Sequence, residues 1–176
     1  MTSLPIDPSS GRTAPASGKS STRRLALAWS ATELVPAVLK VAFASNDRSR
    51  VNQHFGASEG FAIFALDSER AKLVEVAEFA AESMDGNENK LSAKIQALTG
   101  CAAVYCLAAG GSAVRQLLAA GVQPIRLDDE EPIEAILDQL CVAVRDGGIP
   151  WVDKAIRRQC GGSERFERMI EEGWQE

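Results

Sequence analysis

One histidine and one cysteine stand where they could bind a metal. His54, the only histidine in the chain, lies in a polar stretch that directly follows an alternating apolar run. Cys106 ends a second apolar run and is soon followed by two glycines. A single imidazole is too little for a structural zinc site, which needs four protein ligands. It can still serve as one terminal ligand of a preassembled metal cluster.

Both residues also have a purely structural interpretation. The position of His54 alone favours a loop histidine that bonds to nearby backbone. However, Phe55 beside it can be buried as an anchor while His54 points elsewhere, and Gly56 gives the backbone extra freedom. Cys106 could be a core thiol, because free cysteine is among the most buried residue types. For Cys106 the two interpretations are evenly balanced.

The four cysteines do not follow a disulfide or zinc pattern. They are Cys101, Cys106, Cys141 and Cys160, and no two are spaced as Cys-x-x-Cys. Secreted disulfide-rich proteins use denser, regular spacing, so we expect free thiols in a reducing cytoplasm. Cys101 would point to the opposite face of its strand from Cys106, and Cys141 falls within a predicted helix.

A glycine-rich helix start could attract an anion to the same region. Gly110, Gly111 and Ser112 open a predicted helix, whose free N–H groups and positive dipole end suit a negative ligand. No phosphate-binding lysine accompanies them, so this is not a Walker A loop. Three arginines could add positive charge around this helix start, or could be ordinary surface residues. They are Arg48, Arg50 and Arg115.

The elements that would position these residues indicate a mixed α/β domain. Apolar and alternating runs predict five strands, at residues 39–44, 60–66, 72–79, 102–106 and 123–127. The second and third strands form a hairpin, and helical crossovers make the last two strands parallel to a neighbour. This layout is that of ribonuclease H-like folds. We place the first strand centrally beside the fourth, which brings the His54 loop and Cys106 to one edge of the sheet.

The ends of the chain differ from its middle. Residues 1–38 are predicted to be a disordered leader, because a stretch rich in Ser, Thr, Pro, Gly and Ala buries little apolar surface. Residues 39–148 form the predicted binding domain, and residues 149–176 form a helical tail that packs on the domain or on a partner. The apolar run after Arg23 and Arg24 is far too short to span a bilayer, so no membrane partner is expected.

Charge and motif content exclude several functional classes. The chain has 19 basic and 24 acidic side chains and a net charge of −5, which argues against a nucleic-acid binder. The first strand carries no acid for the Mg²⁺ site of a nuclease. No Ser–His–Asp arrangement of a hydrolase suggests itself. We therefore predict that the protein is not an enzyme.

The stretch from Leu39 to about Arg158 resembles the nitrogenase iron–molybdenum cofactor biosynthesis family. The resemblance rests on an ordered set of segments, at residues 39–45 (LKVAFAS), 53–56 (QHFG), 100–106 (GCAAVYC), 112–118 (SAVRQLL), 121–124 (GVQP) and 172–174 (EGW).

This resemblance implies a ribonuclease H-like fold without nuclease activity. It further implies a carrier that transiently binds an iron–sulfur precursor of the cofactor. The partners would be the assembly scaffold and cluster-donor proteins, and a monomer is one state that the sequence leaves open. His54 takes the place of the family's cluster-binding histidine, whereas Cys106 as a second ligand rests on our own geometric argument.

Two other interpretations stay open. The protein could be an interaction chaperone of the nitrogenase machinery that contacts proteins and binds no cluster. A small hydrolase or nuclease is a more remote alternative, since the first strand lacks the acid of a nuclease site.

Overall fold

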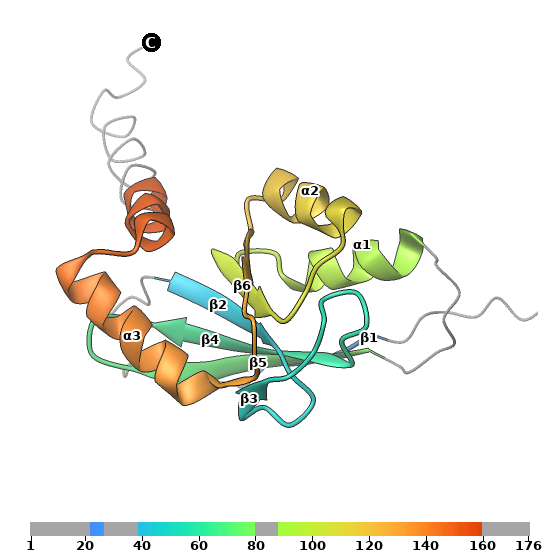
Figure 1. The fold of residues 1–176 in the computed structure, drawn as a ribbon, viewed down its shortest axis with the longest axis horizontal. Helices are drawn as coiled ribbons and strands as arrows, with labels where there is room; N and C mark the ends of the chain where they lie inside the picture. The colour runs from blue at the N-terminus through green and yellow to red at the C-terminus, as the bar shows by residue number, and fades with distance from the viewer. Residues whose placement is uncertain (1–21, 27–38, 80–87, 160–176) are drawn as a thin grey trace, which may run out of the picture.

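The computed structural model describes residues 22–26, 39–79 and 88–159 (Figure 1). Its main sheet has six strands in the order β1-β5-β4-β2-β6-β7. Their bounds are Thr22–Ala26 (β1), Leu39–Ala44 (β2), Gly60–Leu66 (β4), Ala71–Phe79 (β5), Ala103–Cys106 (β6) and Gln123–Arg126 (β7). A second, two-stranded sheet pairs β3 (Arg50–Val51) with β8 (Glu131–Pro132). The labelled helices are α1 (Glu88–Ala97), α2 (Gly111–Ala119) and α3 (Ile133–Asp146). Residues 150–159 form a further helix.

The central position of β2 confirms the predicted strand order. β2 is antiparallel to β4 and parallel to β6, with Val41 opposite Ala103 and Phe43 opposite Tyr105. The helix connections α1 and α2 make this parallel arrangement possible, because a parallel partner must be reached through a crossover. The mixed α/β class is therefore confirmed, and nothing in the architecture conflicts with a ribonuclease H-like layout.

Helices cover both faces of the sheet (Figure 1). Alternate residues of β2 enter different cores, because side chains in a strand point to opposite faces. Leu39, Val41 and Phe43 pack in the core that α3 covers. Ala42 and Ala44 pack in the core shared with α1 and α2. Cys106 and Phe55, the neighbour of His54, also pack in this second core.

The predicted sheet of five strands has to be corrected to six. β1 comes from within the stretch assigned to the disordered leader and pairs with β5 at the edge of the sheet. Arg24 bonds to Glu75 of β5, so long-range pairing orders a segment that has little apolar content of its own. The rest of the leader, residues 1–21 and 27–38, lies outside the described residues, as do residues 160–176 with the last predicted helix and Cys160.

The segment after α3 contributes to the main core. Val152 of the helix at residues 150–159 is fully buried, and the Trp151 ring lies 6.4 Å from that of Tyr105, centroid to centroid. The domain boundary at residue 148 stays a prediction. In the part of the chain that is described, no helix has the length and apolar character needed to cross a membrane.

Two adjacent leucines test the orientation of α2. Leu117 is fully buried, whereas Leu118 is 51% exposed. We expect Leu117→Ala to lower the free energy of unfolding by about 2–5 kcal/mol, and Leu118→Ala to change it by less than about 0.5 kcal/mol. Urea unfolding of both variants measures this, and equal losses would mean that α2 faces the sheet differently.

Candidate functional site

The segment that carries His54 is hydrogen-bonded to the residues that directly follow β6. Leu107 donates its N–H to the carbonyl of Gln53 (3.0 Å), and Phe55 donates its N–H to the carbonyl of Ala108 (2.8 Å). These bonds form because β2 and β6 run parallel, so the loops that leave their carboxyl ends meet at one edge of the sheet. The structure therefore brings the His54 loop, Cys106 and the start of α2 together, as the predicted strand order requires.

His54 points outward while its neighbour anchors the loop. Phe55 is fully buried and stacks on Phe61, with ring centroids 5.4 Å apart. His54 is exposed, and within the described residues its imidazole forms no hydrogen bond or ion pair. The structure thus does not show the local backbone bond of the alternative interpretation. The ring is available to an incoming ligand.

The Cys106 thiol lies beneath the loop and is hidden from solvent. Cys106 is 1% exposed and packs in the same core as Phe55. Burial raises the pKa of the Cys106 thiol, and a hydrogen bond from the backbone of Phe55 only partly opposes this shift. Metal ligation needs an accessible thiolate. The geometry favours a core thiol in this state, and Cys106 as a ligand stays a prediction.

Two of the three candidate arginines are held by acidic partners. The guanidinium of Arg48 donates to a carboxylate oxygen of Glu78 at 3.0 Å. Arg50 lies 3.7 Å from the Glu130 carboxylate and donates to the Glu130 carbonyl at 3.1 Å. Arg115 on α2 is exposed, and no ion pair with it is found among the described residues. Arg115 is therefore the arginine whose charge stays available to a ligand near the α2 start.

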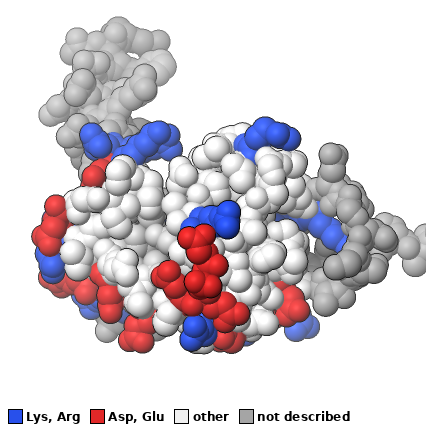
Figure 2. All heavy atoms as spheres, in the orientation of Figure 1, with Lys and Arg blue, Asp and Glu red and all other residues white. Residues whose placement is uncertain are grey.

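Acidic side chains surround the Arg50 pair. Residues 128–131 are all acidic and join β7 to α3, and three of the four are exposed. Acidic groups also gather on the face seen in Figure 2. Because these carboxylates repel a negative ligand, Arg50 is a poor anion-binding residue.

The loop before β3 is shaped by one carboxylate. Asp47 accepts hydrogen bonds from the N–H groups of Ser49 (2.8 Å) and Arg50 (2.9 Å) and from the Ser45 hydroxyl (3.0 Å). These bonds, led by that from Ser49, lower the pKa of Asp47 to about 2. They hold the turn in which Arg48 adopts a φ of 64°. Asp47 thus fixes the path of the chain toward His54.

The start of α2 presents unpartnered N–H groups. Gly110 is the N-cap and provides no side-chain cap, and the first turn contains no acid. Because Val114 makes the first helical bond to Gly110 (3.0 Å), the N–H groups of residues 111–113 have no partner inside the helix. A Cβ at Gly110 or Gly111 would meet nothing within 4 Å. This end of α2 is open and suits an anion.

Lys94 is not among the predicted site residues, and it contacts the His54 loop from below. Its ammonium donates to the carbonyl of Gly56 at 2.6 Å and lies 3.4 Å from that of Phe55. Lys94 is 7% exposed. Helical spacing contained the signal, because Lys94 is three residues after Leu91 and four before Leu98, on the apolar stripe of α1.

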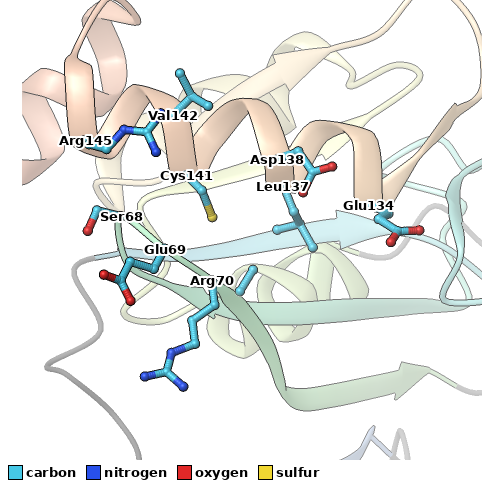
Figure 3. Close-up of a pocket in the computed structure, with 10 residues that line it drawn as sticks. Ser68, Glu69, Arg70, Glu134, Leu137, Asp138, Cys141, Val142 and Arg145 are labelled. Carbon is cyan, nitrogen blue, oxygen red and sulfur yellow. The ribbon is translucent and has the colours of Figure 1, made fainter.

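The two cavities that we describe lie away from His54. One, of about 620 Å³, is bounded by α3 and the β4–β5 turn, and Figure 3 shows Cys141 and Asp138 pointing into it. The other, of about 480 Å³, lies between the end of α2 and the helix at residues 150–159. None of the predicted site residues lines either cavity. Among the described residues, no three His, Cys, Asp or Glu side chains are grouped so that they could hold a metal ion.

Thiol alkylation tests whether Cys106 is hidden. We expect iodoacetamide to modify Cys141, which is partly exposed, well before Cys106 in the folded protein at pH 8. Peptide mass spectrometry at several times measures both rates in one sample. Equal rates would show that the Phe55 loop opens at rest and that the thiol can reach a ligand.

Comparison with known proteins places the chain in a family. The family model described as dinitrogenase iron-molybdenum cofactor matches residues 37–143, which include every predicted site residue. Protein NifX of Azotobacter vinelandii is 51% identical over 140 residues, covering 79% of this chain and 89% of that protein. Protein NifX of Herbaspirillum seropedicae is 36% identical over 135 residues, covering 76% and 90%.

A more distant match is the FeMo cofactor biosynthesis protein NifB of Bradyrhizobium diazoefficiens, which is 29% identical over 101 residues. That match covers 56% of this chain and 20% of the other protein. The family match extends from just before β2 into α3, and so contains the central strands, the His54 loop and the start of α2. This chain belongs to the dinitrogenase iron–molybdenum cofactor family.

Proposed function

We propose that this protein is a cytoplasmic carrier that binds an iron–sulfur precursor of the iron–molybdenum cofactor and passes it to the next protein in cofactor biosynthesis. Family membership and the printed names of the relatives support a role in this biosynthesis. The observation that carries the proposal is the exposed His54 imidazole, which has no hydrogen bond among the described residues and lies on the loop bonded to the segment before α2.

The chemistry of the cargo fits this arrangement. Iron–sulfur clusters are commonly anionic and take imidazole as a terminal ligand in some proteins. The neutral His54 ring can donate a lone pair to one iron. The N–H groups at the start of α2 and the exposed Arg115 would face the negative sulfides.

The small number of protein ligands suits a carrier. Four cysteines would hold a cluster permanently, whereas one imidazole can be exchanged for a ligand of the receiving protein. Cys106 could become a second ligand only if the core that it shares with Phe55 opens and exposes the thiol. In this proposal the protein acts by binding and not by catalysis, and its partners are cluster-donor proteins and the assembly scaffold.

A cluster-loading experiment tests the role of His54. The purified protein is incubated without oxygen with a synthetic [4Fe–4S] cluster bearing thiolate ligands, and iron and sulfide per chain are measured after desalting. We expect His54→Ala to lose most of the loading because the other described ligands are hidden or distant. Cys141→Ser is the matched control, since it removes a partly exposed thiol outside the site, and it should load like the wild type.

The same experiment separates the rival function. A wild-type protein that takes up no cluster from any donor, yet still binds the cofactor scaffold, would be an interaction chaperone. Loading that His54→Ala leaves unchanged would remove the histidine from the site.

A charge change at the start of α2 gives an independent test. Gly111→Glu places an acid in the first helical turn. Its negative charge interacts favourably with the helix dipole and stabilises the folded state by about 0.3–1 kcal/mol. The same charge repels an anionic cluster, so stability should rise while loading falls. Gly111→Gln is the matched neutral control and should load normally. Thermal unfolding and iron content are measured on both variants, and equal loading would argue against an anion at this helix end.

A further inference from the structure

Lys94 is a charged side chain buried directly under the candidate loop. It is 7% exposed, and its ammonium donates to the Gly56 carbonyl at 2.6 Å and approaches the Phe55 carbonyl at 3.4 Å. It also lies 5.5 Å from the centre of the Phe79 ring. These two carbonyls belong to the residues that directly follow His54. The contact therefore links α1 to the position of the imidazole.

The charge of Lys94 has no acidic counterpart among the described residues. The groups around it are the carbonyls of the loop, the Phe79 ring of β5, and Lys90 one helical turn away, which adds a second positive charge. Burial, followed by Lys90, lowers the pKa of Lys94 to about 8. At neutral pH the ammonium still carries its proton, so the fold retains a buried charge that costs stability.

Such a charge acts on the loop in two ways. It draws the carbonyl oxygens of Phe55 and Gly56 inward, so their negative ends are turned away from the exposed side of the loop. The Ser58 hydroxyl, which donates to the same Phe55 carbonyl at 3.0 Å, assists this orientation. The ammonium also adds positive potential near His54, and poor screening by the surrounding protein makes this potential effective.

We propose that Lys94 is the residue that positions the His54 loop and makes it selective for an anionic ligand. The inference rests on the function proposed above. It adds a residue whose positive charge favours an anionic ligand over a neutral or cationic one. Lys94 does not touch the ligand in this scheme, because the loop lies between them.

Two substitutions at Lys94 separate charge from hydrogen bonding. Lys94→Gln keeps an N–H donor for the carbonyls and removes the charge, and Lys94→Met removes both. With the synthetic thiolate-ligated [4Fe–4S] cluster as the probe, we expect each variant to bind about tenfold more weakly than the wild type. Lys154→Gln, which removes an exposed charge from the helix at residues 150–159, is the control and should change affinity less than twofold.

The pH dependence of the free energy of unfolding distinguishes Lys94 from a lysine whose only role is to stabilise the fold. The folded pKa of Lys94 lies below the unfolded value of 10.5, so the cost of its charge is fully present below pH 8 and disappears as the pH rises to 10.5. Lys94→Met should therefore be as stable as the wild type or more stable at pH 7, and any advantage should shrink toward pH 10.5. Urea unfolding at both pH values measures this.

The ring signals of the single histidine report on the loop. Weaker cluster binding by the Lys94 variants supports the proposal. If the NMR signals of His54 do not move, Lys94 acts through its charge, and if they shift, Lys94 acts by positioning the loop. Wild-type affinity in both Lys94 variants would overturn it, as would a marked loss of stability at pH 7 in Lys94→Met with normal binding in Lys94→Gln. These results are distinguishable from a failure of the proposed function, in which the wild type itself takes up no cluster.

Discussion

The parallel pairing of β2 with β6 is the contact on which the candidate site depends. It aligns the carboxyl ends of two strands that are about sixty residues apart in the chain. The loop after β2 and the segment after β6 then meet and exchange backbone hydrogen bonds. Without this pairing, His54 and the start of α2 would have no reason to lie at the same edge. The helices that make the crossovers also cover the sheet, so the same connections build the core and the site.

Burial of one aromatic ring decides how the two possible metal ligands differ. Phe55 packs on Phe61 in the core that also contains the buried Cys106 thiol. Because His54 directly precedes Phe55, the anchor that enters this core leaves the imidazole exposed. Of the two candidate ligands, only His54 is exposed in the part of the chain that the structure describes. A carrier that must release its cargo benefits from such a small number, since fewer bonds have to be exchanged.

The electrostatics of the site come from backbone and buried groups more than from surface arginines. Arg48 and Arg50 are paired with acids, and the acidic run before α3 makes the neighbouring surface negative. The open N–H groups of α2 lack acidic competitors in the first turn. Lys94 adds a fixed charge beneath the loop at a cost to stability. Functional sites often retain such unfavourable local arrangements.

The sequence by itself determined the alternation of five strands with helical crossovers and the place of the first strand beside the fourth. These features follow from local periodicity and from the handedness of crossovers. Only the tertiary structure decided that β1 joins the sheet, that Arg48 and Arg50 are paired, that Cys106 is covered, and that Lys94 supports the loop. Each of these depends on a contact between residues far apart in the chain. Helical spacing places Lys94 on the apolar stripe of α1, but periodicity does not identify the distant partner in any of these contacts.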